Sequence, residues 1–392
     1  METAKLVLKK KEEDRMLAGH LWAFSNEIGR IEGNPGLGDI VGLYSAGGIF
    51  MGLGFFNQKS LISFRLLTRQ QEDTGKEFFK KKISAALEYR KQLYPGQDSF
   101  RAVFGESDGV PGLVVDKYGD YLSAQILSAG IEKIRTEIIE ALIEVFAPAG
   151  IIFRNDSQLR GLEGLELKVE VVHGEIPDAV EIKENGLKFI VNLKLGQKTG
   201  FFFDQRDNRL ALSKFCEGKT VLDCFSHTGA FGVYAAGAGA KKVTCVDSSM
   251  PALESAEKNA KANGLSGVME FVNGDAGEYL QHLREQSAKY DIIILDPPAL
   301  IKNKKSFHQG IRLYSKLNEA AMRLLPANGL LATSSCSHHL PRQDFKQMME
   351  DASGKSGAYF KIIEFKGQSL DHPVLLSMPE TEYLKFAILR KN

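Results

Sequence analysis

The sequence predicts an α/β protein whose C-terminal half is a doubly wound, mostly parallel sheet, preceded by a small β-barrel and an α+β middle domain. From residue 220 onwards, apolar runs of strand length alternate regularly with helical patterns. The first seventy residues instead hold short apolar runs separated by turn-rich stretches. Between these regions, short strand patterns surround one helical stretch. We therefore expect three domains, at residues 1–70, 71–178 and 179–392.

The composition is that of a globular protein with a large core: 392 residues, of which 43% are hydrophobic. Fifty Lys and Arg residues balance 49 Asp and Glu residues, which argues against a protein that coats nucleic acid by bulk charge but allows a local basic surface. Four cysteines without a CxxC pair or zinc-type spacing predict neither a metal site nor disulfides. No apolar run approaches the roughly 18 residues that span a bilayer, so we expect a cytoplasmic protein without a membrane anchor.

Apolar runs and turn residues divide the first 178 residues into strands and two helices. The helix expected at residues 76–93 carries basic side chains between its apolar ones, so one face is basic. A second helix is expected at residues 130–146. Strands are expected at residues 5–8, 39–44, 48–55 and 60–67, and in the middle region at 101–104, 112–116, 121–126, 150–154 and 168–172.

The C-terminal half begins with a hairpin, because Asn185-Gly186 separates two apolar runs at residues 180–184 and 187–193. The helix expected at residues 252–263 has clear ends, since Ser248 or Ser249 can cap it and Gly264 can terminate it. The other helices are expected at 230–238, 278–286, 309–325 and 343–352, and the strands at 220–225, 242–247, 268–273, 290–295, 329–334, 359–365 and 383–389, the last two with a connection that suits an antiparallel arrangement.

Each of the first four strands of this sheet carries a carboxylate at or near its end: Asp223, Asp247, Asp275 and Asp296. The loop after the first strand lacks the GxGxxG turn of a dinucleotide site, which disfavours nicotinamide and flavin cofactors. S-adenosylmethionine suits the acids better. Asp247 would bind the ribose hydroxyls, Asp275 the adenine amino group and Asp223 the cationic end. Acids at strand ends also cap helices, and that alternative holds for each one singly.

Two further segments point to chemistry. Three consecutive phenylalanines follow Thr199-Gly200, and because their exposure would be costly they must face a core, a cofactor or a base; the start of an amphipathic helix is the alternative. Cys336 follows a strand, and the turn Asp296-Pro297-Pro298 follows another. A strand-end thiol and an acid-Pro-Pro turn together suggest covalent chemistry on a pyrimidine ring. Cys224 is the competing thiol, and a buried, inert thiol is the alternative for Cys336 itself.

Four motifs in one order carry a family resemblance: residues 197–206 (QKTGFFFDQR), 222–229 (LDCFSHTG), 296–298 (DPP) and 335–339 (SCSHH). The chain resembles the bacterial 23S ribosomal RNA large-subunit methyltransferases that form 5-methylcytosine, the RlmI family. Residues 19–24, 38–39 and 64–65 look like the PUA domain that begins those proteins. The resemblance covers essentially the whole chain. It implies a Rossmann-like class I fold that uses S-adenosylmethionine.

The resemblance implies catalytic roles for two residues. The Cys336 thiolate would add to carbon-6 of cytosine, and Asp296 would hold the ring nitrogen or exocyclic amine. Many RNA cytosine-5 methyltransferases carry a second cysteine where this chain has Ala299, so product release must use another base. His338 or His339 could help to deprotonate the thiol, or serve the loop structurally. Contacts with the cofactor are expected from Thr199, Gly200, Phe201, Phe202, Arg206, Asp223, Phe225, Ser226, Thr228, Gly229, Asp247, Ser248, Asp275, Ala276, Asp296 and Pro297.

The expected partner is 23S ribosomal RNA, and a homodimer is left open. Basic residues just after the acid turn would contact phosphates beside a flipped-out base, although a lysine-rich loop is often only solvated surface. Two other functions stay open: methylation of a ring or exocyclic nitrogen of ribosomal RNA guanine, which needs no thiol, and a non-catalytic RNA-binding assembly factor. The residues expected to contact RNA are Lys302, Lys304, Lys305 and Arg312.

Overall fold

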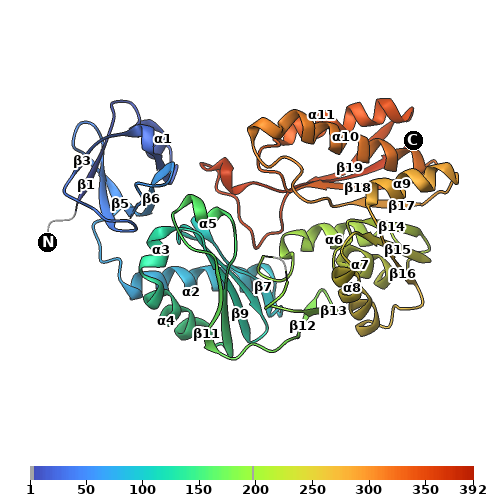
Figure 1. The fold of residues 1–392 in the computed structure, drawn as a ribbon, viewed down its shortest axis with the longest axis horizontal. Coiled ribbons are helices and arrows are strands. Elements are labelled where there is room, and N and C mark those ends of the chain that lie inside the picture. Colours follow the sequence, from blue (N-terminus) through green and yellow to red (C-terminus); the bar gives the residue numbers. More distant parts are fainter. Residues whose placement is uncertain (1–3, 197) are drawn as a thin grey trace. The chain divides into compact units, whose positions relative to one another are not determined.

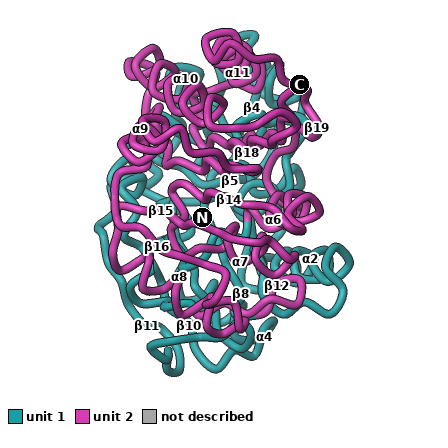
Figure 2. The backbone as a smooth tube through the Cα atoms, turned by 90° about the vertical axis from the view of Figure 1, so that its right-hand side faces the viewer, with its two compact units in different colours: residues 1–182, 191–203, 371–381 teal, residues 183–190, 204–370, 382–392 magenta. Residues whose placement is uncertain are grey.

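The computed structural model describes residues 4–196 and 198–392, and the chain forms two compact units. Unit 1 comprises residues 1–182, 191–203 and 371–381, and unit 2 comprises 183–190, 204–370 and 382–392 (Figure 2). Gln197, the first residue of the QKTGFFFDQR motif, lies outside the described residues. None of the helices described is long and apolar enough to cross a membrane.

The first sheet of unit 1 has six strands in the order β2-β6-β5-β4-β1-β3 (Figure 1). The sequence did not predict β2, β3 or the short helix α1. The residues of β3 are mostly exposed and β2 has three residues, so neither shows the alternation of a half-buried strand. The elements are β1 (Lys5–Leu8), α1 (Glu13–Leu17), β2 (Trp22–Phe24), β3 (Ile28–Glu32), β4 (Ile40–Tyr44), β5 (Phe50–Phe56) and β6 (Ile62–Thr68).

The second sheet of unit 1 has five strands in the order β11-β10-β9-β8-β7. The helix predicted at residues 130–146 is two helices, because Ile134 leaves the helical conformation, with φ −105° and ψ 30°. The elements are α2 (Lys76–Leu93), β7 (Ser99–Phe104), β8 (Leu113–Tyr118), β9 (Tyr121–Ile126), α3 (Ala129–Lys133), α4 (Arg135–Phe146), β10 (Gly150–Asn155), α5 (Leu159–Leu162) and β11 (Lys168–Gly174).

The two sheets of unit 1 share packing. Phe55 and Leu67 of the first sheet belong to the same buried cluster as Phe79 of α2 and Phe100 of β7. The Arg65 guanidinium forms ion pairs with Glu106 and Glu163, both at 2.9 Å. These contacts connect the first seventy residues to the middle sheet within a single unit.

A segment from the far end of the sequence, residues 371–381, completes unit 1. The Asp371 carboxylate accepts a hydrogen bond from the Arg101 amide at 2.9 Å, and its carbonyl accepts one from the buried Arg90 guanidinium at 2.8 Å. The Ser377 hydroxyl donates to the Gly19 carbonyl at 2.9 Å. The segment therefore connects to both sheets of the unit.

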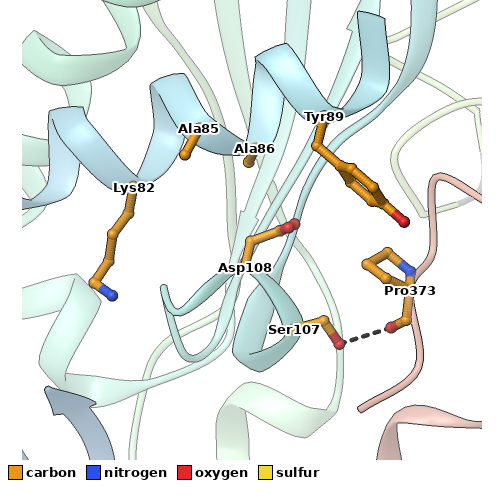
Figure 3. Close-up of a pocket in the computed structure, with 7 residues that line it drawn as sticks. All are labelled: Lys82, Ala85, Ala86, Tyr89, Ser107, Asp108 and Pro373. Carbon is orange, nitrogen blue, oxygen red and sulfur yellow. Dashed lines mark hydrogen bonds between the residues drawn. The ribbon is translucent and has the colours of Figure 1, made fainter. Parts of the chain in front are cut away.

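The helix α2 is less basic on its surface than the sequence indicates. Arg90 is fully buried and pairs with Asp108 at 2.6 Å, and Lys76 and Lys80 both pair with Glu144. A surface pocket lies beside this helix (Figure 3). On one side of the pocket, the Ser107 hydroxyl donates a hydrogen bond to the Pro373 carbonyl at 2.7 Å. It is lined by Lys82, Ala85, Ala86, Tyr89, Ser107, Asp108 and Pro373.

The predicted hairpin is present as β12 (Val180–Glu184) and β13 (Leu187–Val191). Asn185 and Gly186 have φ angles of 49° and 86°, the left-handed conformation that a two-residue turn of this kind requires. The chain passes between the two units in this hairpin.

Unit 2 contains a seven-stranded sheet in the order β16-β15-β14-β17-β18-β20-β19. The first five of these strands run parallel and β20 runs antiparallel to both of its neighbours, so the predicted doubly wound sheet with an antiparallel end is confirmed. The strands are β14 (Thr220–Cys224), β15 (Lys242–Asp247), β16 (Met269–Asn273), β17 (Ile292–Leu295), β18 (Leu330–Ser335), β19 (Phe360–Lys366) and β20 (Lys385–Lys391).

Helices cover both faces of this sheet (Figure 1). One face packs on α9, α10 and α11 through a buried cluster that includes Leu280, Tyr314 and Phe345. On the other side, α6 is held by Arg206 and Arg209, whose buried guanidinium groups pair with the buried Glu184 carboxylate. The helices are α6 (Arg206–Ser213), α7 (Ala230–Gly237), α8 (Met250–Ala262), α9 (Ala276–Glu285), α10 (Phe307–Leu324) and α11 (Arg342–Ser356).

Candidate active site

The order of the strands in the seven-stranded sheet reverses next to β14. The chain proceeds to β15 and β16 on one side of β14 and then returns to β17 on the other side. In open α/β sheets, ligands bind outside the carboxyl ends of the strands at such a point. Asp223 lies near the end of β14 and Asp296 directly follows β17. Because Cys224 pairs in parallel with Leu295, the two carboxylates lie at the same edge of the sheet.

The loop between β14 and α7 has an unusual backbone. Phe225, His227 and Gly229 have positive φ angles of 60°, 50° and 73°. A non-glycine residue in this region costs about 1–3 kcal/mol, and such strain is concentrated at functional sites. Asp247, the last residue of β15, holds the loop, because its carboxylate accepts hydrogen bonds from the His227 and Ser249 amides at 2.8 Å each. Its contact with a ribose stays a prediction.

Asp223 has a buried carboxylate that is only half satisfied. One oxygen accepts a hydrogen bond from the Gly232 amide at 2.9 Å, while the other, Oδ1, has no hydrogen-bond partner among the described residues. Burial, together with the Asp296 and Asp247 charges, raises the pKa of Asp223 to about 8 against the opposing effect of the Gly232 amide. An acid in this setting favours a cationic ligand, which would stabilise its ionised form.

Asp296 is held in place by two neutral donors. One oxygen, Oδ1, accepts a hydrogen bond from the Gln205 amide at 2.9 Å and another from the Ser334 hydroxyl. Burial raises the pKa of Asp296 to about 6, although the hydrogen bond from Ser334 opposes this. The carboxyl group can therefore gain or lose a proton near neutral pH.

The acid after the third strand caps a helix. Asp275 is exposed, and its carboxylate accepts a hydrogen bond from the Glu278 amide at 3.0 Å at the start of α9. Ala276 begins that helix and is buried. Ser249 caps α8, while Ser248 is exposed. All four residues follow β15 or β16, so they lie at the same edge as Asp223, and their predicted contacts with an adenosine stay predictions.

Cys336 lies at the same edge of the sheet as Asp296. Thr333 pairs with Leu295, which puts Ser334 beside Asp296 and Cys336 two residues beyond. Among the four cysteines, all of which the structure describes, Cys336 alone is partly exposed. Burial raises the pKa of Cys216 to about 12 and those of the other two buried thiols well above the ordinary value.

The turn that carries Cys336 is fixed on both sides. The Tyr314 hydroxyl lies 2.9 Å from the Ser335 hydroxyl and 3.0 Å from the Ser337 hydroxyl. Ser337 in turn accepts a hydrogen bond from the Ile301 amide at 3.1 Å, in the loop after the acid turn. Sequence reasoning missed Tyr314, Ser334 and Gln205 as supporting residues, because only the pairing of β17 with β18, the packing of α10 and the position of the segment before α6 bring them to the site.

The residues of the aromatic motif divide between the units. Thr199, Gly200, Phe201 and Phe202 belong to unit 1, where Phe201 is buried and its amide donates to the Tyr118 hydroxyl at 2.8 Å. Phe202 is partly buried. Arg206 belongs to unit 2, and its ion pair with Glu184 supports α6. Its contact with a cofactor stays a prediction.

Phe225 packs against the core of unit 2, and Phe231 is buried and stacks on Phe386 with ring centres 6.0 Å apart, so both aromatic side chains of the loop contribute to the core. Thr228 accepts a hydrogen bond at its carbonyl from the Asn259 amide at 2.9 Å. The structure thus brings together Asp223, Phe225, Ser226, Thr228, Gly229, Asp247, Ser248, Asp275, Ala276, Asp296 and Pro297 at one edge of one sheet.

The predicted RNA contacts are exposed. Lys302, Lys304 and Lys305 lie in the segment that joins the acid turn to α10, and Arg312 lies in the second turn of that helix. No group of three or more His, Cys, Asp or Glu side chains within residues 4–196 and 198–392 is placed to hold a metal ion.

The polar groups at the sheet edge fit S-adenosylmethionine. Asp223 Oδ1 and the Ser226 hydroxyl are buried, and neither has a hydrogen-bond partner among the described residues. Three carboxylates, those of Asp223, Asp247 and Asp296, raise the negative charge there. A cofactor that carries an ammonium, a sulfonium and two ribose hydroxyls would supply both the missing donors and the missing positive charge.

Comparisons with known proteins agree with this geometry. Residues 6–69 match the PUA-like domain family, and residues 163–355 match the family of S-adenosylmethionine-dependent methyltransferases. The predicted class of fold and cofactor is thereby confirmed. A protein from Streptococcus mutans described as a SAM-dependent methyltransferase is 25% identical, with a TM-score of 0.85 over 98% of this chain and 99% of that one. Another protein described as a methyltransferase, solved in complex with SAH, is 26% identical, with a TM-score of 0.87 and the same coverage.

Curated relatives extend over the full length of the chain. The ribosomal RNA large subunit methyltransferase I of Aeromonas salmonicida is 40% identical over 390 residues, 98% of each chain. The proteins of the same name from Pseudoalteromonas atlantica and Vibrio cholerae are 39% and 38% identical, with at least 98% of each chain covered. The carboxylates at the edge of the sheet, the amino-terminal match and these full-length similarities lead to one conclusion: the chain belongs to the family of ribosomal RNA large subunit methyltransferase I.

Proposed function

We propose that this protein transfers a methyl group from S-adenosylmethionine to carbon-5 of a cytosine in 23S ribosomal RNA, through a covalent adduct with Cys336. The observation that carries the proposal is the register of β17 and β18, which brings a partly exposed thiol to the same edge of the sheet as the Asp296 carboxyl group, at the switch point. The names of the relatives support an RNA of the large subunit.

The thiol is needed to activate the cytosine ring. Carbon-5 is too weak a nucleophile to attack a methyl group unaided, so the ring must be activated. When the Cys336 thiolate forms a bond to carbon-6, the electron pair of the ring double bond becomes available at carbon-5. Asp296 in its protonated form donates a hydrogen bond to the ring nitrogen, which stabilises the charge that develops there.

The remaining steps transfer the methyl group and restore the ring. When bound, S-adenosylmethionine would supply the methyl group on a sulfonium, and its sulfur would keep the electron pair of the broken carbon–sulfur bond and leave as S-adenosylhomocysteine. Because Ala299 stands where many relatives of the wider class have a second thiol, a water molecule beside Asp296 would accept the proton from carbon-5 and pass it to the solvent. The carbon-6 to Sγ bond then breaks, which restores the ring and the thiolate. The sequence of steps needs no metal ion.

We also propose roles for the parts that hold the RNA. The amino-terminal region of residues 1–70, with its PUA-like match, would bind folded RNA, followed by a middle domain to residue 178 and the methyltransferase domain from residue 179. We expect the protein to act in the cytoplasm, where its RNA substrate is found. The target base must leave its stack to reach a thiol at a sheet edge.

Product analysis tests the function. Ribosomal RNA from cells that lack the protein is incubated with the protein and S-adenosylmethionine, and one portion is digested to nucleosides and another to oligonucleotides. Mass spectrometry of the nucleosides identifies the modified base, and mass spectrometry of the oligonucleotides locates it. We expect 5-methylcytidine, at a cytosine that is unmodified in those cells and modified in wild-type cells. Methylguanosine would instead support transfer to a nitrogen, and the absence of any methylated product would support a non-catalytic assembly factor.

The exposed lysines after the acid turn should contribute to RNA affinity through phosphates. We expect Lys304→Gln with Lys305→Gln to weaken RNA binding about tenfold at low salt and to lower the slope of log Kd against log salt by about 1–2. The measurement is a binding titration at several salt concentrations. Lys258→Gln with Lys261→Gln, two exposed lysines of α8, is the matched control. Equal slopes in both double variants would contradict the assignment.

A further inference from the structure

One buried cation lies at the base of the turn that carries Cys336. Lys385 is the first residue of β20, and it pairs in register with Ser335, the residue before the thiol. Its ammonium donates to the Ser337 carbonyl at 2.7 Å, on the other side of the thiol. The residue is 2% exposed. A charged group is rarely buried without a partner, because the loss of hydration is costly.

The charges around Lys385 indicate which group its ammonium serves. Besides Ser337, it donates to the Tyr383 carbonyl at 2.9 Å, and neither carbonyl carries a full charge. The carboxylate nearby, Glu382, already pairs with Arg342 of α11 at 2.6 Å. Two further ionisable groups act on Lys385, the Cys336 thiol and Arg342, and of these two the thiol is the one that can carry the opposite charge.

From this geometry we infer that Lys385 holds Cys336 in its thiolate form, as a positioning residue behind the nucleophile. The inference rests on the proposed function, because it assigns Lys385 a role only if Cys336 attacks a base. The electrostatic attraction between two charges is mutual. If the thiolate stabilises the ammonium, the ammonium therefore stabilises the thiolate to the same extent.

The remaining neighbours agree with this arrangement. Burial lowers the pKa of Lys385 to about 8, the negative charges of Cys336 and Glu382 oppose that shift, and Arg342 adds to it. The Tyr314 hydroxyl also faces Cys336, and burial raises the pKa of Tyr314, so that group stays neutral near pH 7. His338, two residues beyond the thiol, is exposed. Lys385 therefore provides a buried positive charge at the turn that carries Cys336.

The test is the rate of alkylation of Cys336 by iodoacetamide as a function of pH, followed by peptide mass spectrometry on the free protein. Lys385→Gln keeps a donor for the two carbonyls and removes the charge, and Lys385→Met removes both. We expect the pH midpoint to rise by about one unit or more in these variants. Lys385→Arg keeps the charge and should shift the midpoint by much less.

A second lysine of the same strand provides the matched control. Lys391 also donates to two carbonyls, those of Met322 and Leu325 at 3.3 and 2.8 Å, and it lies at the opposite end of β20 from Lys385. Lys391→Met should leave the midpoint unchanged. An unchanged midpoint in Lys385→Gln, or an equal shift in Lys385→Arg, would overturn the inference.

The two proposals can fail separately. The alkylation measurement uses neither RNA nor cofactor, so it reports on the thiolate alone. If Cys336→Ala keeps full methyl transfer, the proposed function is wrong whatever the midpoint. If Cys336→Ala is inactive and the midpoint of Lys385→Gln equals that of the wild type, only the role of Lys385 is wrong. If neither Lys385→Gln nor Lys385→Met folds, Lys385→Arg alone decides. A pH midpoint of alkylation that rises by a full unit in Lys385→Arg would show that the positive charge does not hold the thiolate.

Discussion

Replacement of Cys336 by alanine should reduce methyl transfer by at least about 10³-fold while leaving the affinity for S-adenosylmethionine unchanged. Without the thiol, carbon-5 of cytosine lacks the activation that covalent addition supplies. The side chain is partly exposed at the end of β18, so its truncation leaves no large cavity in the core. The measurements are single-turnover transfer to ribosomal RNA and equilibrium binding of the cofactor.

A trapping experiment sharpens this prediction. RNA that carries 5-fluorocytosine at the target position should remain covalently attached to the wild-type protein, because carbon-5 cannot release fluorine as a cation. Cys336→Ala should form no such adduct. Cys216→Ala, which changes a fully buried cysteine after α6, is the control and should keep both transfer and trapping. Trapping by Cys336→Ala would point to Cys224 or to another nucleophile.

Replacement of Asp223 by asparagine should weaken binding of S-adenosylmethionine at least about 100-fold, a loss of about 2.7 kcal/mol, because a buried carboxylate would no longer face the cationic end of the cofactor. The unpartnered Oδ1 atom is the observation behind this expectation. Isothermal calorimetry gives the affinity. An affinity within threefold of the wild type would mean that the cofactor binds elsewhere along the edge.

The same substitution should stabilise the protein without cofactor. The folded-state pKa of Asp223, about 8, lies above the ordinary value for an aspartate, so the folded state retains a proton that the unfolded state has lost. Stability from this group therefore falls as the pH rises from about 4 to about 8. Asp223→Asn removes that loss, and its gain in unfolding free energy should be about 1–2 kcal/mol larger at pH 8 than at pH 6.

Denaturant unfolding at both pH values checks this. Asp351→Asn, which neutralises an exposed carboxylate on α11, controls for the change in net charge and should show no such dependence on pH. A gain in Asp223→Asn that is equal at the two pH values would mean that the carboxyl group is already ionised in the free protein.

Much of the methyltransferase sheet could be predicted from the sequence, because its strands are continuous apolar runs that alternate with amphipathic helices. The proximity of Cys336 and Asp296 followed from that order, since consecutive parallel strands of such a sheet end at one edge. The role of Asp275 as a helix cap was among the alternatives, and the structure shows that hydrogen bond.

Other features depend on contacts between distant residues and have no local signal. The Lys385 ammonium reaches the Ser337 carbonyl only because β20 enters antiparallel beside β18 with a particular register, and a single-residue shift would turn its side chain to the other face. Arg90 looks like one more basic residue on α2, yet it is buried against Asp108. The break at Ile134 lies within a continuous helical pattern, so the sequence carries no local signal for it.

The segment of residues 371–381 affects how the chain can mature on the ribosome. Residues 1–182 of unit 1 are translated long before residues 371–381, yet the Asp371 carboxylate and carbonyl accept hydrogen bonds from the Arg101 amide and the Arg90 guanidinium. A nascent chain that has emerged only to residue 182 therefore lacks part of its own unit, and the Arg90 guanidinium lacks one of its acceptors. Unit 1 can be completed only after residues 371–381 have been translated, and by then all of unit 2 except residues 382–392 has been translated as well.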